Sequence, residues 1–543
     1  MDYLQSIEIG NATALRIAVA PSLVNDAQRL ANEFATTLTL SDDAHVRSQF
    51  TEFCRQRGKT DASAASIAAA LDTESPHNNL AIFGDALHSA GGPHCLAELR
   101  YLTSVYRSQT HEFTEQLSQF LTSEAQDIAV AHYYPHGLNV AAWLATQDNS
   151  EPTDNASYLA SSPVAVPLAG LVQLVRVLVH CCLSGLPISD YVRQFRAVTG
   201  YGQGLVVAAA VASATSDEQY VAAAKRALGT LILAGCLPLH VAPEPTLHPS
   251  AVAEGQQHEG VPTTIIKVRG SPQYIVDAVL SKYNAQFRDQ PSAKLHLSAI
   301  NTDDEFIVSG HISEMYQFVR VVRSKSNPAG VDQSQVPFHA RKPEVQVTFL
   351  PTAVVPLYCE HMSAVVDRHM SIAAAKGWNY SAAVDDEDSQ LLVPLRACSD
   401  GKETTHSGAD LARILVESVY MRRINWPLAI GRPDTTRIVD FSGADSHLSA
   451  ITRQTIQGHG ISLVSAVVST SSTTDNGANW AQAFGPRLVR LTTPSNNGKL
   501  HLDTPLSRVL GHPAVLVAGV QPTTANVHFV AAVAHAGYLA ELA

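Results

Sequence analysis

Cysteine, charge and long uninterrupted hydrophobic runs are all scarce in this sequence of 543 residues. The seven cysteines include no CxxC pair, so neither a disulfide framework nor a zinc module is indicated. Only 16% of residues are charged, and 37 basic against 49 acidic residues leave a net charge of −12, which argues against a nucleic-acid partner. Pro167, Gln173, Arg176 and His180 interrupt the most apolar stretch, Val164–Leu183. It therefore predicts a buried helix and no membrane span.

Apolar residues, by contrast, make up 45% of the chain. That share supports full-sized cores and excludes wholesale disorder. The N-terminal sequence MDYLQSIEIGN is acidic and lacks the basic region and apolar core of a targeting peptide. With so few cysteines, a reducing compartment is the simplest expectation, and we expect a cytoplasmic protein.

The order of apolar and polar residues predicts a mixed α/β protein. Leu80–Phe83 is a short apolar run of the kind found in strands. Helical spacing of apolar residues extends over Ala97–Phe120 and Leu168–Leu183. Two polar stretches, Lys59–Asn79 and Ala382–Gly408, predict exposed connections.

One segment, Thr264–Lys325, predicts a complete small unit. Its alternating strand and helix patterns cover Thr264–Arg269, Ile275–Phe287, Lys294–Ala299, Glu305–Ser309 and Ile312–Val322. The order βαββα is typical of a split-βαβ module. We therefore expect a compact subdomain inserted into a larger α/β domain.

The clearest local motif is the sequence AVTGYGQGLV over 197–206. An apolar segment leads into Gly200, Gly202 and Gly204, and a helical pattern follows, which is the outline of the nucleophile elbow G-x-S-x-G. Its central position is Gly202, so the side chain that would attack a thioester is absent. The spacing fits neither a dinucleotide fingerprint nor a phosphate-binding Gly-Lys-Ser/Thr loop. A glycine-rich turn without chemistry is the alternative interpretation.

With these motifs the sequence resembles the N-terminal part of the fungal fatty acid synthase β subunit, with its acetyl transferase domain. The matching segments, in order, are Ala81–Gly84 with the strand before a Gly-Gly-Gln-Gly loop, Thr199–Val206 with T-G-H-S-Q-G-L-V, Glu305–Gly310 with F-V-V-S-G, Asn327–Phe338 with P-S-G-L-D-Q-S-R-I-P-F, and Ile438–Phe441 with I-L-D-F. Pro505–Ala543 resembles the opening of the enoyl reductase barrel.

The resemblance implies an α/β fold: an α/β-hydrolase-like acyltransferase domain with an inserted ferredoxin-like subdomain, plus a C-terminal stub of a TIM-type barrel. The expected divisions are an N-terminal region over 1–75, the acyltransferase-like domain over 76–381 with the insert at 264–325, a mixed α/β connecting region over 382–504, and the start of an enoyl-reductase-like barrel over 505–543. A parallel barrel needs eight strands to close, and the segment 505–543 reaches only the second of them. So short a segment cannot hold flavin, and we therefore expect no FMN and no other cofactor.

Carried over position by position, the resemblance predicts a degenerate site. The family's nucleophilic serine falls on Gly202, its catalytic histidine on Tyr358 and its oxyanion-hole glutamine on Ala86. Acyl transfer needs an activated nucleophile and donors for the oxyanion, and a tyrosine with an ordinary pKa of about 10 is a poor base at neutral pH. Cys359 and His361 are weak substitutes for nucleophile and base, and Cys359 also reads as a buried apolar residue. The histidine and cysteine spacing predicts no metal site.

Three functions stay open at this point. The first is a β-subunit-like protein of fungal fatty acid or secondary-metabolite biosynthesis, with a degenerate acyl-CoA:acyl carrier protein transacylase-type domain. The second is an active acyl transferase that takes acyl-CoA as substrate and uses a relocated residue such as Cys359. The third is a non-catalytic assembly or docking partner of a synthase complex. The partners implied are a synthase α subunit or an acyl carrier protein, with no nucleic acid and no membrane.

Overall fold

The structure is a computed structural model, and most of the part that it describes lies between residues 78 and 466. Within that range it leaves out 87–91, 146–155, 185, 241–246, 328–332, 334, 337–341, 343, 351–354, 379–389, 407–408, 432–434 and 444–445; outside it, it describes 3–9, 13–19, 490–492, 501–503, 516–518, 531–533 and 539–541. Most of the expected Asn327–Phe338 motif therefore lies outside the described residues.

The two ends of the chain each contain isolated strand pairs. β1 (Tyr3–Ile9) pairs with β2 (Thr13–Val19), and β14 (Arg490–Thr492) with β15 (His501–Asp503), both antiparallel; β16 (Leu516–Ala518) and β17 (Leu539–Glu541) are parallel. The last pair falls in the segment expected to open a barrel. Apart from it and residues 531–533, that segment lies outside the described residues, so the barrel stub stays a prediction.

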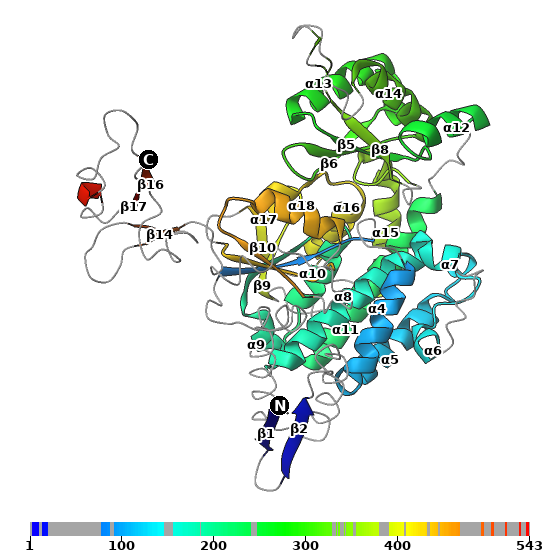
Figure 1. Ribbon diagram of the computed structural model, residues 1–543. Helices are drawn as coiled ribbons and strands as arrows, with labels where there is room; N and C mark the ends of the chain where they lie inside the picture. The colour runs from blue at the N-terminus through cyan, green and yellow to red at the C-terminus, as the bar shows by residue number, and fades with distance from the viewer. Residues whose placement is uncertain are drawn as a thin grey trace.

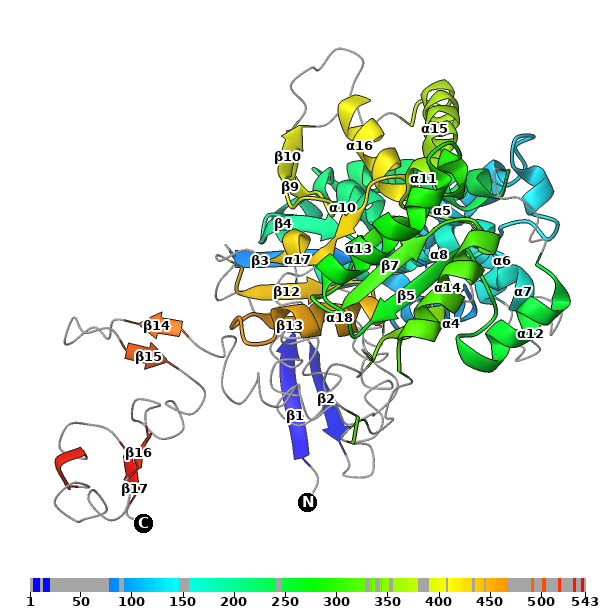
Figure 2. The same cartoon turned by 90° about the horizontal axis from the view of Figure 1, so that it is seen from above.

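A six-stranded sheet forms the centre of the described part, in the order β10-β9-β4-β3-β12-β13 (Figure 2). The strands are β3 (Asn79–Phe83), β4 (Phe195–Gly200), β9 (Gln390–Arg396), β10 (Glu403–His406), β12 (Arg437–Asp440) and β13 (Ser462–Ser465). All neighbours are parallel except β10 and β9. Each residue of β3 is buried, as expected for a parallel strand covered on both faces.

The expected exposed connection over Ala382–Gly408 is wrong for its second half. β9 and β10 lie in this stretch and are the last two strands at one edge of the main sheet. The alternating burial of β9, with Leu391, Val393 and Leu395 inside, shows that a short apolar run outweighs the polar residues around it. Strands after residue 382 therefore complete the sheet that begins at β3, and the sheet spans the expected division at 381/382.

Helices cover the main sheet, and Figure 1 shows α4, α5, α8 and α11 gathered beside it. The helices of this part are α4 (Gly92–Val105), α5 (Arg107–Glu124), α6 (Val140–Ala145), α7 (Ala156–Ala160), α8 (Ser162–Ser184), α9 (Ile188–Val192), α10 (Gly204–Ala212), α11 (Asp217–Cys236), α15 (Ser363–Ala375), α16 (Ala409–Tyr420), α17 (Trp426–Ile430) and α18 (His447–Ile456). The helical region predicted over Ala97–Phe120 is two helices, because Tyr106 has a non-helical φ of −113° and ψ of 41°.

Two helices of the described part, α8 and α11, are long and apolar enough to cross a membrane by length and composition alone. However, 94% of the apolar window of α8 and 78% of that of α11 are buried inside the protein. The polar residues that interrupt the apolar run in α8 are buried with it. The sequence prediction of a buried helix is confirmed.

A second sheet has the strand order β11-β6-β7-β5-β8. Its elements are β5 (Ile265–Arg269), α13 (Gln273–Asn284), β6 (His296–Ile300), β7 (Glu305–Ser309), α14 (Ile312–Lys325), β8 (Gln346–Phe349) and β11 (Ile424–Asn425). α13, α14 and α12 (Pro249–His258) lie at the top of Figure 1 with this sheet. The βαββα order predicted for Thr264–Lys325 is present, and its strands enclose a separate core centred on Phe306 and Phe318.

Candidate functional site

The elbow predicted from sequence forms at the carboxyl end of β4. β4 ends at Gly200, α10 starts at Gly204, and Gly202 between them has a φ of +52°, a conformation that glycine adopts at little cost. The flanking positions also need glycine, because a side chain at Gly200 would strike the backbone of Gly204 and one at Gly204 would strike the carbonyl of Phe83. The elbow therefore has the tight geometry of its motif without a side chain at its tip.

The side chain of Tyr358 occupies the space where a nucleophile would lie. A Cβ atom on Gly202 would collide with the Tyr358 hydroxyl. That hydroxyl donates a hydrogen bond of 2.7 Å to the Asp85 carboxylate, and both residues are buried. Tyr358 has a φ of +57°, a left-handed conformation that is uncommon outside glycine. Tyr358 thus closes the tip of the elbow.

The electrostatics keep Tyr358 protonated. Burial raises its pKa well above 10, and the nearby Asp85 and Tyr201 raise the pKa further, because a phenolate would be both desolvated and next to a negative charge. A base must be able to take up a proton near the working pH. At neutral pH the Tyr358 phenol carries its proton, so it cannot act as a base.

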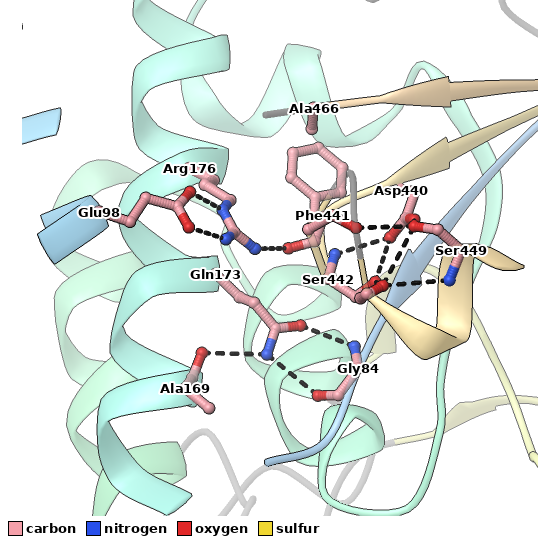
Figure 3. A network of polar contacts seen from close by, with 12 residues as sticks. Gly84, Glu98, Ala169, Gln173, Arg176, Asp440, Phe441, Ser442, Ser449 and Ala466 are labelled. Atoms are coloured by element: carbon pink, nitrogen blue, oxygen red, sulfur yellow. Dashed lines mark hydrogen bonds and ion pairs between the residues drawn. The ribbon is translucent and has the colours of Figure 1, made fainter. Parts of the chain in front are cut away.

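Ala86 and its neighbours form the loop after β3. The Ala86 N–H donates to Oε1 of Gln203 at 3.3 Å, and the Gly84 N–H donates to Oε1 of Gln173 at 2.8 Å. Nε2 of Gln173 in turn donates to the Gly84 carbonyl at 3.0 Å (Figure 3). These backbone donors are engaged by side-chain amides, and the space between this loop and α8 is too small for a water molecule.

A stripe of buried polar residues on α8 faces the ends of three neighbouring strands. Gln173 binds Gly84 after β3, and Arg176 donates to the Phe441 carbonyl after β12. His180 contacts the Ala466 carbonyl after β13 at 2.6 Å. Glu98 of α4 pairs with Arg176 (Figure 3). Residues three and four apart share a helix face, so one helix fixes the strand ends that border the elbow.

Asp440, at the end of β12, is held in the same region. The backbone N–H and hydroxyl of Ser442 donate to its Oδ1 at 2.7 Å and 2.6 Å, and Ser449 donates to its Oδ2 (Figure 3). Burial raises the pKa of Asp440, although the serine bonds and Arg176 oppose that rise. The bonds hold the turn between β12 and α18 in place.

A second polar chain joins the elbow to the smaller sheet. The Tyr201 hydroxyl donates to Oδ1 of Asn301 at 2.8 Å, and Nδ2 of Asn301 donates to Glu305 at 2.9 Å. His447 contacts the same Glu305 oxygen at 2.7 Å. Burial alone would raise the pKa of Glu305, but the bonds from His447 and Asn301 lower it to about 2. The two sheets are thus linked by a hydrogen-bonded path that starts beside Gly202.

Cys359 and His361 are not arranged as a nucleophile and its base. The Cys359 thiol donates to the Pro356 carbonyl at 3.0 Å, and burial raises the pKa of the thiol to about 12. Nε2 of His361 donates to the Lys294 carbonyl at 2.9 Å. Each side chain is bonded to a different carbonyl, so the pair lacks the thiol–imidazole bond that defines such a dyad.

Sequence reasoning missed four residues at the elbow: Asp85, Gln173, Gln203 and Cys398. The Cys398 sulfur faces the backbone N–H of Gly202, and burial raises the pKa of its thiol to about 11. Gln203 and Asp85 directly adjoin the motif positions and could have been examined there. Gln173 is readable only as a polar residue within an apolar helix, and Cys398 carries no local signal, because only the fold brings them near the elbow. Among the residues that the structure describes, no group of three or more histidine, cysteine or acidic side chains could hold a metal ion.

Comparisons with known proteins show what this chain is similar to. Residues 81–343 match the family described as "Starter unit:ACP transacylase in aflatoxin biosynthesis". The fatty acid synthase subunit beta of Schizosaccharomyces pombe is 31% identical over 88% of this chain. The fatty acid synthase beta subunit aflB of Emericella nidulans is 29% identical over 82% of it. The crystal structure of FabD from Acinetobacter baumannii, 13% identical, superposes with a TM-score of 0.47 over 74% of this chain and 98% of that one.

The two curated relatives are much longer than this chain, which spans about a fifth of the length of each, 22% and 21%. The similarity nevertheless extends over most of the present sequence. The family match over residues 81–343 includes β4, the elbow and the strands β5, β6 and β7 of the smaller sheet. The resemblance seen in the motifs is confirmed: most of this chain is similar in sequence to fungal fatty acid synthase β subunits, and residues 81–343 are similar to a transacylase family.

Proposed function

We propose that this chain is a β-subunit-like protein of fungal fatty acid or secondary-metabolite biosynthesis whose transacylase-type domain forms no acyl-enzyme. In this proposal it acts in the cytoplasm, without FMN, as a non-catalytic assembly or docking partner of a synthase α subunit or an acyl carrier protein. The strand order β6-β7-β5-β8 supports the further proposal that residues 264–325 are a ferredoxin-like insert in an α/β-hydrolase-like domain.

The observation that carries the proposal is the contact between Tyr358 and the tip of the elbow. Gly202 supplies no nucleophile, and the Tyr358 hydroxyl fills the volume that a side chain there would need. A thioester carbonyl would have to approach the same point to be attacked. The hydrogen bond to Asp85 holds Tyr358 in place, so the closure does not depend on a freely rotating side chain.

The thiols near the elbow supply the rival proposal of an active transferase. Only a thiolate attacks a thioester efficiently. Cys359 and Cys398 are buried, with pKa values near 12 and 11. Both therefore stay protonated at neutral pH, which favours the non-catalytic proposal.

Intact-protein mass spectrometry tests the proposal directly. The purified chain is incubated with acetyl-CoA and, separately, with malonyl-CoA, and the mass is read before and after. We expect no acetyl or malonyl adduct. A stoichiometric adduct would overturn the proposal, and peptide mapping of Cys359→Ala and Cys398→Ala variants would show which thiol carries the acyl group.

The docking half of the proposal has its own readout. Immobilised acyl carrier protein and synthase α subunit are each exposed to the purified chain, and binding is measured by surface plasmon resonance. We expect saturable binding to one of them. Absence of binding to both, at concentrations up to solubility, would contradict the docking proposal whatever the mass spectrum shows.

A further inference from the structure

A pocket of about 450 Å³ lies between the smaller sheet and the segment that follows Tyr358. Its titratable lining comes from three separate parts of the chain: Lys294 and His296, just before and at the start of β6; His311 before α14; and Glu360 with His361 in the short 3-10 helix Glu360–Met362. The residues that form the elbow are not part of this lining. The pocket is therefore separate from the closed site around Gly202.

Three imidazoles meet in this pocket. The His361 ring centre lies 4.7 Å from that of His296 and 5.5 Å from that of His311. A carbonyl can only accept, so the bond from Nε2 of His361 to Lys294 fixes the proton of that ring on Nε2. Nε2 of His296 is buried and has no hydrogen-bond partner in the structure. Buried polar atoms are normally paired, so His296 has capacity for a further partner.

The backbone adds to the positive character of the pocket. His311 immediately precedes α14, and no side chain caps the start of that helix. Ser363, which also lines the pocket, is the first residue of α15, and no side chain caps that helix either. The N-terminal N–H groups of a helix carry partial positive charge and favour anions.

Acidic side chains near the pocket offset its basic ones. Lys294 is near enough to lower the pKa of His296, while Glu360 acts to raise it. Glu314 in the first turn of α14 acts in the same direction on His311 and accepts a bond from Tyr283. Protons added to the imidazoles therefore shift the charge of the pocket toward positive.

We propose that this pocket binds the phosphate group of an organic phosphate ester. Lys294 and the imidazoles supply the charged donors, Ser363 and the helix N-termini supply neutral donors, and His296 gains a partner. A phosphate fills only part of 450 Å³, which leaves room for the organic part of the ligand. The inference goes beyond the proposed function, because it requires neither acyl transfer nor a docked protein.

The binding should strengthen as the pH falls. Burial, together with the neighbouring His361, lowers the pKa of both His296 and His311, so these rings are neutral at neutral pH. Protonated imidazoles would donate to the phosphate, whereas the nearby carboxylates of Glu360 and Glu314 oppose the anion. Affinity for phosphate should therefore rise as the pH falls below about 6.5.

Isothermal titration calorimetry with inorganic phosphate tests the site on the full chain. We expect saturable binding that is tighter at about pH 5 than at about pH 6.5, a range in which the imidazoles gain protons. Lys294→Met and His311→Asn should each weaken it roughly tenfold, the loss expected for one charge-assisted hydrogen bond. His258→Gln, an exposed histidine outside the pocket, should leave the affinity unchanged. Circular dichroism establishes that each variant is folded before titration.

Two further ligands distinguish the source of the phosphate. Coenzyme A carries a diphosphate and a ribose phosphate, whereas 4′-phosphopantetheine carries one phosphate, and pantetheine carries none. We expect pantetheine not to bind, and whichever phosphate ester binds more tightly identifies the ligand class. Equal binding of pantetheine and its phosphate, or phosphate affinity unchanged in both pocket variants, would overturn the inference. The acyl-adduct test is unaffected by either result, so the two proposals can fail separately.

Discussion

Tyr358 carries a large side chain at a φ of +57°, and its hydroxyl lies where a Cβ of residue 202 would be. Histidine enters the left-handed region more readily than most residues, which fits the resemblance that places a histidine at this position. From this backbone conformation the tyrosine hydroxyl reaches the Asp85 carboxylate. Residues 202 and 358 therefore share one volume, and the size of one limits the size of the other.

Replacing Gly202 by serine should destabilise the protein by roughly 2–4 kcal/mol, because the new side chain both clashes with Tyr358 and occupies a left-handed backbone. The Gly202→Ser, Tyr358→Ala double variant should be less destabilised than the sum of the two single variants by at least about 1 kcal/mol. Urea denaturation of all four proteins gives the coupling energy. Restored transfer activity is not expected, since base and oxyanion donor would still be absent.

Gly377 provides a matched control for the serine substitution. It has a φ of +67°, with no other atom within 4 Å of an added Cβ. Gly377→Ser should therefore be destabilised only by its left-handed backbone, which costs about 1–2 kcal/mol of the free energy of unfolding. Its effect should be additive with that of Tyr358→Ala. Equal costs at both glycines, or strict additivity at Gly202, would contradict the shared-volume explanation.

For single residues, the sequence predicts which positions differ from the family motif, but not which side chain occupies the space at each of them. The glycine at 202 and the tyrosine at 358 are readable from the motif and its spacing. Their contact is not, because the positions are far apart along the chain. Asp85 adjoins a motif position, and only the structure shows that its carboxylate accepts a hydrogen bond from the Tyr358 hydroxyl.

Among the elements, α8 has the largest influence on the elbow region. Its residues 173, 176 and 180 face the ends of β3, β12 and β13, and each binds a backbone group there. The sequence contains this pattern, since the three polar residues that interrupt the apolar run recur at helical spacing. Their burial could be predicted, but the strands that they reach depend on the sheet order, which no local pattern specifies.

Arg176→Met should destabilise the protein by about 3–5 kcal/mol, because it leaves the largely buried Glu98 carboxylate without its partner. The exposed pair Arg193–Asp190, with both side chains more than half exposed, provides the control. Arg193→Met should cost at most about 1 kcal/mol. Thermal and urea unfolding compare the two, and a similar small loss in both would show that Arg176 does not hold the strand ends.

Elements with a continuous periodic pattern are predicted well, and those that depend on distant partners are not. β3, β4, α10 and the βαββα unit follow directly from apolar spacing and glycine positions. β9 was missed, since Leu391, Leu392 and Val393 lie within a polar stretch and the strand that contains them pairs with β10 on one side and β4 on the other. Non-local pairing of this kind is decided by tertiary packing.

For the whole molecule, buried histidines set the response to acid. Burial lowers the pKa of His180 to about 4 and that of His369 to about 3, whereas in the unfolded chain both titrate near 6.5. As the pH falls below about 6.5 the unfolded state takes up protons first, so stability falls between about pH 6.5 and about pH 4. His369→Gln should flatten this slope, measured as the urea midpoint at each pH.

Buried phenols set the response to base. Burial raises the pKa values of five fully buried tyrosines well above 10: Tyr191, Tyr201, Tyr220, Tyr358 and Tyr420. Their stabilising effect is complete below about pH 10 and is lost as the pH rises above it, since the unfolded chain then releases protons that the folded one retains. Phenolate absorbance should therefore appear together with unfolding, and ordinary titration of these phenols in the folded protein would contradict the assignment.

The contact between residues 202 and 358 also restricts the order in which a lineage could have acquired them. A tyrosine in this position and a side chain at 202 would compete for one volume and destabilise the protein, so we expect the glycine at 202 to be in place first. The reverse change is restricted in the same way, because a serine at 202 destabilises the protein until the residue at 358 has become smaller. Recovery of a nucleophile by single substitutions would therefore have to begin with a smaller residue at Tyr358. That first change would bring no activity by itself, which makes reversal of the present pair improbable.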